Sequence, residues 1–338
     1  MNEYHYNCVD ESVLLPLLNK YIFTPLHKLV PLGIPANSLT LFSIVLMWGG
    51  FISFLNTKEL SAGHALSAAG VVWGYVVFDH FDGIQAKVTS TSSPLGEILD
   101  HYSDVFNGLI VIYLCFRILE IELGALFLVI IWLNCLAFAV TYVEQQIRKQ
   151  LYFGPIGSLE GVILVIAVML SCANPSGLQF WQTPILLGQP AYLLIIGGFS
   201  ASCFFTVFGS FQRLEALPRN FIEFTLTGSL LLGVCLYLRL HWAIPFLVVS
   251  FYAGDFILKS MQGVFFDRIQ PLPDRFAGLV VLAVLPCEFF ELDYEVVLLA
   301  YGIYLLLQIV SRGTHILTRF KEYWVWWNPP PDCAPPKT

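Results

Sequence analysis

The chain has 338 residues, of which only 12% are Asp, Glu, Lys or Arg and 57% are hydrophobic. An average soluble domain carries about a quarter charged residues, so this composition excludes a disordered chain and argues strongly against a soluble globule. Lys and Arg number 17 against 24 Asp and Glu, a net charge of −7, which also excludes a basic nucleic-acid-binding protein. The composition predicts an all-α, polytopic membrane protein.

The first 38 residues mix charged residues, prolines and apolar residues. They contain no short apolar core before a cleavage site, so we expect no secretory signal peptide. Between Asp10 and Val30 the apolar residues recur at nearly helical spacing, as at Val13, Leu17 and Leu18. This spacing predicts an interfacial amphipathic helix; a lead-in helix packed on the bundle fits equally well.

About ten later stretches are apolar and long enough to predict membrane spans, each needing roughly 20 residues. They lie near Leu39–Leu55, Ala62–Phe78, Val105–Leu119, Leu123–Tyr142, Gly161–Cys172, Ala191–Phe208, Phe221–Leu238, Trp242–Leu258, Phe276–Phe290 and Val296–Val310. With the N-terminus inside, 14 of the 17 basic residues fall on the inner side, which predicts cytoplasmic termini.

One segment interrupts the apolar pattern between the second and third spans. Asp79 and Asp82 are three residues apart, and Asp100 and Asp104 are four apart, so each pair shares a helix face. The Ser/Thr-rich link of residues 89–93, followed by Pro94, predicts a turn between two antiparallel helices. The four carboxylates are therefore expected to meet at the membrane surface.

Four carboxylates so close cannot all stay ionised without a compensating charge. Divalent cations such as Mg²⁺ prefer carboxylate oxygens and bridge them to substrate phosphates. Two such ions can stabilise both sides of a phosphoryl displacement, so the spacing predicts metal-assisted chemistry on a phosphate or pyrophosphate. A solvated acidic loop is the alternative, but acids this near apolar spans are costly unless they have a function.

Three neighbouring residues fit this interpretation. Gly83 leaves room for a phosphate or nucleotide against the helix, and Gly96 would let two helices approach closely, although each is compatible with plain helix packing. Lys87 would neutralise a diphosphate or anchor the helix end at the interface.

The segment from Asp79 to Asp104 resembles the signature of the CDP-alcohol phosphotransferase family. That signature reads D-x-x-D-G-x-x-A-R, eight or nine residues, G-x-x-x-D-x-x-x-D. The present chain reads Asp79-x-x-Asp82-Gly83-x-x-Ala86-Lys87, eight residues, Gly96-x-x-x-Asp100-x-x-x-Asp104. Residues 92–101 are similar to the choline/ethanolamine phosphotransferase branch, which has about ten spans. Further similarity to that branch lies in residues 10–14, 35–41 and 157–161.

The resemblance implies two Mg²⁺ or Mn²⁺ ions on Asp79, Asp82, Asp100 and Asp104, with Asp79, Gly83, Ala86 and Lys87 along the CDP moiety. It implies transfer of phosphocholine or phosphoethanolamine from CDP-choline or CDP-ethanolamine to a lipid hydroxyl, diacylglycerol above all, with release of CMP. His101 and Asp104 are the candidate general bases, and we favour His101, because a metal-bound carboxylate is a weak base; a role in orienting Asp100 is its alternative. The family also implies a homodimer.

On this basis we divide the chain into four parts: an N-terminal interfacial segment (1–38), a catalytic core (39–210), C-terminal transmembrane helices (211–327) and a proline-rich tail (328–338). The active site would face the cytoplasm, in the endoplasmic reticulum or Golgi or in a bacterial inner membrane. Glu144 and Glu160 either line the substrate path or cap helices.

The chain departs from the family pattern at two positions. Lys87 replaces an Arg, and Lys lacks the bidentate fork that Arg offers to phosphate. Tyr102 stands where the branch has Gly, and its ring would crowd the pocket or face a quaternary amine. Four alternatives remain: another acceptor such as ceramide, an intramembrane prenyltransferase, a transporter with an acidic ion pathway, or a catalytically silent relative of the family.

Overall fold

The computed structural model describes residues 7–324, except 58, 156, 187, 267–270 and 285–292. The proline-rich tail expected at 328–338 therefore lies outside the described residues. The chain forms two compact units. Unit 1 contains the chain up to Leu119, residues 153–191 and the segment from Leu317 onward, and unit 2 contains Glu120–Tyr152 and Tyr192–Ile316.

Unit 1 begins with strand β1 (Cys8–Asp10), and its second segment begins at Phe153, the last residue of strand β2 (Leu151–Phe153). A helical run follows, made of α1 (Leu15–Leu18), a π-helical turn η1 (Asn19–Phe23) and α2 (Thr24–His27). It is shorter than the helix expected over residues 10–30. The Ser12 hydroxyl accepts a hydrogen bond from the Leu15 amide (3.0 Å), so the helical run begins only after Ser12.

The N-terminal run combines features of both predicted arrangements, the interfacial amphipathic helix and the helix packed on the bundle. Phe23 and His27 are buried, and the run packs against helix α4. The opposite side exposes Val13 (62%), Leu17 (54%) and Tyr21 (65%), an apolar face with no protein cover in the described part of the chain. The segment is therefore packed on the bundle and amphipathic at the same time.

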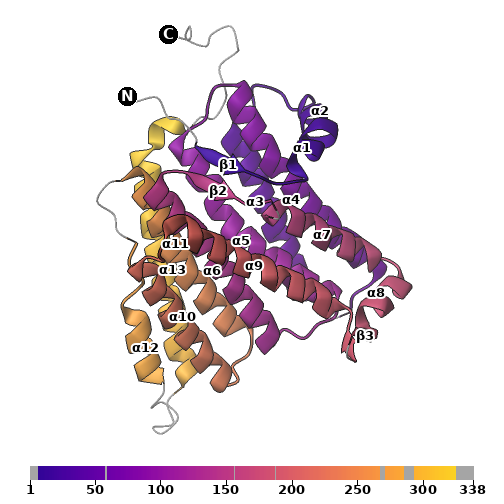
Figure 1. Cartoon of the computed structure of the whole chain (residues 1–338), viewed down its shortest axis with the longest axis vertical. Helices are drawn as coiled ribbons and strands as arrows, with labels where there is room; N and C mark the ends of the chain where they lie inside the picture. Colours follow the sequence, from indigo (N-terminus) through magenta and orange to yellow (C-terminus); the bar gives the residue numbers. More distant parts are fainter. Residues whose placement is uncertain are drawn as a thin grey trace. The chain divides into compact units, whose positions relative to one another are not determined.

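Four longer helices build the body of unit 1. Helix α4 contacts α3, α5 and α7, and α5 contacts α3 and α7 as well (Figure 1). Their bounds are Ala36–Leu55 for α3, Ala62–Val88 for α4, Pro94–Ile118 for α5 and Ser158–Ser171 for α7. After α7 the chain bends by 118° into α8 (Pro175–Gln182), and a small hairpin of β3 (Pro184–Leu186) and β4 (Gln189–Pro190) follows. A 3₁₀ turn, η3 (Lys321–Tyr323), ends the described chain.

The turn between α4 and α5 is the one that the sequence predicts. Helix α4 ends at Val88, and α5 begins at Pro94, where the missing proline N–H costs no helical hydrogen bond. Ser93 is the N-cap residue of α5, and its hydroxyl accepts a hydrogen bond from the Gly96 amide at 3.1 Å. This short connection brings the ends of the two helices that carry the four aspartates together.

Unit 2 consists of helices around a buried aromatic core. The bounds are Ala125–Arg148 for α6, Tyr192–Leu214 for α9, Arg219–Tyr237 for α10, Ala243–Phe265 for α11, Phe276–Val284 for α12 and Tyr294–Arg319 for α13, whose last turn belongs to unit 1. Trp132, Phe224 and Tyr252 pack together, with the rings of Phe224 and Tyr252 stacked at 5.2 Å. A Cβ atom at Gly228 would overlap the Trp132 ring, so this position requires glycine.

Buried charges in unit 2 are paired. Asp255 is 1% exposed and contacts the Lys259 ammonium (2.5 Å) and the Arg312 guanidinium (2.8 Å). Since an unpaired charge among apolar helices is costly, these two cations allow Asp255 to stay ionised inside the helical bundle.

Each of the ten expected spans coincides with a helix. Six helices are long and apolar enough to cross a membrane: α3, α6, α9, α10, α11 and α13. The bent pair of α7 and α8 makes a seventh candidate if it is counted as one span. Helices α4 and α5 have 27 and 25 residues but are not in that set. The expected span at 276–290 is described only as far as Val284. The protein is an integral membrane protein of the all-α class.

Candidate active site

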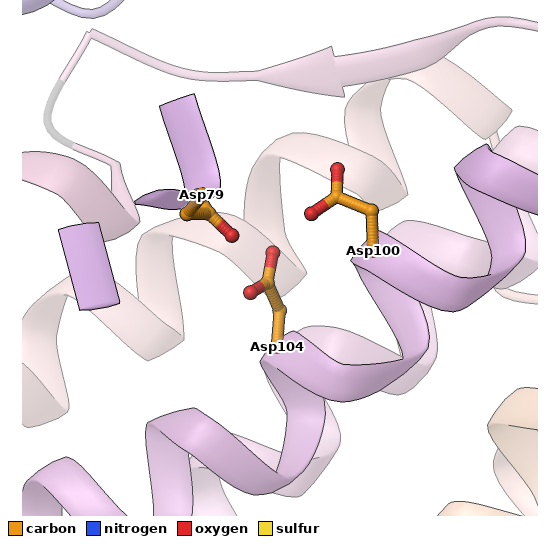
Figure 2. Close-up of side chains that lie close together, drawn as sticks. All are labelled: Asp79, Asp100 and Asp104. Atoms are coloured by element: carbon orange, nitrogen blue, oxygen red, sulfur yellow. The ribbon is translucent and has the colours of Figure 1, made fainter. Parts of the chain in front are cut away.

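Three of the four predicted aspartates converge. Asp79 comes from α4, and Asp100 and Asp104 come from successive turns of α5. One carboxylate oxygen from each lies within 4.8 Å of the others, and all three residues are half-buried. Figure 2 shows the three side chains pointing toward a common space. The i, i+4 spacing on α5 thus produces the expected shared face.

The fourth aspartate, Asp82, lies on the wall of the same cavity but is not part of this close group. It is 6% exposed, and its Oδ2 accepts a hydrogen bond from the Thr40 hydroxyl of α3. Thr40 lies in the segment 35–41 that resembles the family branch, but the sequence pattern indicates no role for it. Only the packing of α3 on α4 reveals this contact.

Two further side chains surround the cluster. The Tyr75 hydroxyl of α4 donates a hydrogen bond to Asp104 Oδ1 at 2.7 Å. His101 Nδ1 lies 3.6 Å from Asp100 Oδ2 and 4.0 Å from Asp104 Oδ2, and the imidazole is 7% exposed. His101 is therefore close to two of the carboxylates, as both of its predicted roles require.

The cluster fits a divalent cation. Asp79 Oδ1 and Asp100 Oδ1 are buried and have no hydrogen-bond partner among the described residues. Carboxylates within a few ångströms repel one another, and orphaned buried oxygens are costly, so the arrangement calls for a positive charge. Hard oxygen ligands are those that Mg²⁺ and Mn²⁺ prefer.

A cavity of about 560 Å³ adjoins the cluster, and every predicted site residue lines it. These residues are Asp79, Asp82, Gly83, Ala86, Lys87, Asp100, His101 and Asp104. A cavity of this size is in the range that holds small-molecule ligands and cofactors. Open space surrounds the missing side chain of Gly83, and Lys87 is exposed. The helix surface beside Gly83 thus has room for a ligand.

Gly96 has a different role from the expected one. A Cβ atom there would lie 3.1 Å from Asn37 Oδ1 and 3.3 Å from the Ser93 hydroxyl. The glycine therefore permits a close approach of α5 to the start of α3 rather than to α4.

The N-terminal segment forms part of the cavity, although no sequence pattern predicts this. Cys8, Asp10 and Ser12 line it. Glu160 at the start of α7 holds this segment: its Oε1 accepts from the Ser12 hydroxyl (2.5 Å) and the Leu14 amide (3.1 Å). Its Oε2 accepts from the Gly157 amide (2.9 Å), which caps α7. Glu160 thus both lines the cavity and caps a helix.

Gln85 attaches the N-terminal segment to α4 at a second point. It lies between two of the predicted site residues, Gly83 and Ala86. The side chain is completely buried; its Oε1 accepts from His27 Nε2 (2.8 Å), and its Nε2 donates to the Ile34 carbonyl (2.6 Å). The sequence gives no signal that Gln85 holds the N-terminal segment, because its partners lie more than 50 positions away.

Two residues singled out in the sequence lie elsewhere. Glu144 does not line the cavity, and its carboxylate forms a bidentate ion pair with Arg213 (2.6 and 2.9 Å). Tyr102 also lies off the cavity lining, and its ring packs edge-on against Phe106 at 5.4 Å. The structure therefore gives Glu144 a structural partner and shows no crowding of the cavity by Tyr102.

Comparison with known proteins agrees with the resemblance of the signature. Residues 34–196 match the family model of the CDP-alcohol phosphatidyltransferases, and this stretch contains all four aspartates, His101 and Glu160. This part of the chain is thus similar to the CDP-alcohol phosphatidyltransferases.

Similar curated proteins come from several eukaryotes. A Schizosaccharomyces pombe protein described as an uncharacterized CDP-alcohol phosphatidyltransferase class-I family protein is 30% identical over 54% of this chain and 48% of its own length. Choline/ethanolaminephosphotransferase 1 of Arabidopsis thaliana is 31% identical over 31% of this chain and 28% of its own. Cholinephosphotransferase 1 of Homo sapiens is 28% identical over 58% of this chain and 50% of its own. The chain thus matches half the length of these three relatives, or less.

Proposed function

We propose that this protein transfers a phospho-alcohol from a CDP-alcohol to a lipid hydroxyl and releases CMP. The donor is CDP-choline or CDP-ethanolamine, and the acceptor is diacylglycerol. The single observation that carries the proposal is the convergence of Asp79, Asp100 and Asp104 beside a cavity that all the signature residues line. The names of the plant and human relatives support the choice of headgroup.

The carboxylates of Asp79, Asp100 and Asp104 would hold the divalent metal, with Asp82 completing the acidic wall. Two bound Mg²⁺ or Mn²⁺ ions would offset the charge of the pyrophosphate and stabilise the charge that develops during displacement. Asp79, Gly83, Ala86 and Lys87 follow one another along α4, so the CDP moiety would lie along this helix. The Lys87 ammonium at the helix end would face the diphosphate.

The chain's own residues then perform the proton transfer. The acceptor hydroxyl oxygen forms a bond to the phosphorus that carries the choline or ethanolamine ester, and the bond from that phosphorus to the oxygen bridging the two phosphates breaks. CMP leaves with that oxygen. The hydroxyl proton passes to His101, whose imidazole is held next to Asp100 and Asp104 (3.6 and 4.0 Å). Asp104 is the alternative acceptor.

The membrane setting is consistent with this chemistry. The distribution of basic residues supports an active site at the cytoplasmic face of the endoplasmic reticulum or Golgi or of a bacterial inner membrane. The apolar face of residues 13–29 would lie in the membrane interface, close to a lipid acceptor. By the family resemblance, the functional unit is a homodimer.

The test is a matrix of donors and acceptors on the purified full chain. CDP-choline and CDP-ethanolamine are each combined with diacylglycerol and with ceramide, in Mg²⁺ and in Mn²⁺, and CMP release and product mass are measured. We expect CMP and a phospholipid from diacylglycerol. The absence of CMP with every CDP-alcohol would refute the proposal, and a ceramide product would reassign the acceptor.

A matched pair of variants tests the role of the cluster. Asp100→Asn removes a charge from the metal site, and Asp293→Asn removes one from an exposed turn where the side chain caps the Glu295 amide (2.9 Å). Substitution of a residue that only orients a metal ligand typically lowers activity 10–100-fold. Asp100→Asn should lower activity by more than this, because Asp100 is itself a proposed ligand, whereas Asp293→Asn should keep full activity. Full activity in Asp100→Asn would contradict the metal-site assignment.

A further inference from the structure

The carboxylates of the cluster differ in what else contacts them. Asp79 Oδ1 and Asp100 Oδ1 are buried without a hydrogen-bond partner among the described residues. Asp104 Oδ1, in contrast, accepts the Tyr75 hydroxyl proton at 2.7 Å. One oxygen of Asp104 is thus committed to a protein donor, whereas Asp79 and Asp100 each keep a buried oxygen open.

Tyr75 is well placed to orient Asp104. It lies one helical turn before Asp79 on α4, it is 8% exposed, and its phenol reaches across to α5. A phenol has a single O–H proton, so this hydrogen bond uses its whole donor capacity. A hydrogen bond to an ionised carboxylate is among the stronger ones in proteins, and a buried ring has little freedom to move. The contact therefore restrains the rotation of the Asp104 side chain.

We propose that Tyr75 is a positioning residue for the metal site: its hydroxyl holds Asp104 Oδ1 and leaves Oδ2 as the oxygen that Asp104 offers to a divalent cation. The inference rests on the proposed function for the identity of the site but concerns metal binding itself. Groups behind the ligands fix ligand orientation in this way in many metal sites, and their loss typically lowers affinity 10–100-fold. Without the Tyr75 hydroxyl, Asp104 would rotate among several orientations, and the cation would bind more weakly.

The test compares two Tyr→Phe substitutions. Tyr75→Phe removes one oxygen and keeps the ring. Tyr113→Phe removes a buried hydroxyl from α5 that donates to the Phe54 carbonyl (3.3 Å) and does not line the cavity. Mn²⁺ binding to each purified protein is measured without nucleotide, from the electron paramagnetic resonance signal of free Mn²⁺. The Mg²⁺ dependence of CMP release and the KM for the CDP-alcohol at saturating Mg²⁺ are measured in parallel.

We expect Tyr75→Phe to bind Mn²⁺ about 10-fold more weakly, to require correspondingly more Mg²⁺, and to keep the wild-type KM for the donor at saturating Mg²⁺. Tyr113→Phe should match wild type in all three. A merely structural role would change the melting temperature and the donor KM as well, and this result would overturn the inference. An unchanged Mn²⁺ affinity in a Tyr75→Phe protein with the wild-type melting temperature would also overturn the inference.

The two proposals fail in different ways. A wild-type protein that binds Mn²⁺ but releases no CMP would refute the proposed function, while weaker Mn²⁺ binding by Tyr75→Phe would still support the inference. A wild-type protein that releases CMP while Tyr75→Phe shows the same metal dependence would refute the inference alone. A wild-type protein that binds no divalent cation would refute both.

Discussion

Glu160 attaches the N-terminal segment to the rest of unit 1, and its removal should loosen that segment. Glu160→Ala deletes the acceptor for the Ser12 hydroxyl (2.5 Å) and the Leu14 amide (3.1 Å). A hydrogen bond to a charged group contributes about 1.5 kcal/mol at the lower end of its range, which suits a half-buried carboxylate. Two such bonds give about 3 kcal/mol, or more than about 100-fold in the opening equilibrium of the segment.

Hydrogen–deuterium exchange of residues 11–18 in detergent or nanodiscs measures this opening directly. Glu160→Ala should exchange faster there, and the KM for the CDP-alcohol should rise, because Asp10 and Ser12 line the cavity. Glu160→Gln keeps one acceptor oxygen and should fall between the alanine variant and wild type. Glu223→Ala is the control, since it removes only an exposed ion pair with Arg219. Wild-type exchange in residues 11–18 of Glu160→Ala would refute the reasoning.

Three further predictions concern stability, each measured as thermal or denaturant unfolding in detergent. Gly228→Val should cost about 1–3 kcal/mol or more by overpacking the aromatic core of unit 2, whereas Gly233→Ala, with open space around it, should be neutral. Asp255→Asn should cost about 3 kcal/mol, because it leaves two cations without their buried anion; unchanged stability would show that they find other partners. Gln85→Met should cost about 2–4 kcal/mol, because His27 and the Ile34 carbonyl lose their buried partner, and a neutral effect would contradict that assignment.

Much of the site was predictable because its parts are local in sequence. Asp79 and Asp82 lie on one helix face, as do Asp100 and Asp104, and helical periodicity alone determines this. The short link at residues 89–93 joins the two helices by a turn, which brings Asp79 close to Asp100 and Asp104 and leaves Asp82 on the wall of the same cavity. The same holds for the helical class and the membrane setting, which follow from the scarcity of charge and the length of the apolar stretches.

The sequence by itself therefore determined a polytopic helical membrane protein with an acidic cluster whose spacing resembles a family signature. Only the tertiary structure decided which partner each carboxylate has: Thr40 from α3 for Asp82, and Tyr75 for Asp104. It also placed residues 8–12 in the cavity wall and gave Glu160 and Gln85 the task of holding the N-terminal segment. The physical reason is that these contacts join residues 29 to 148 positions apart, where no periodicity relates one residue to the other.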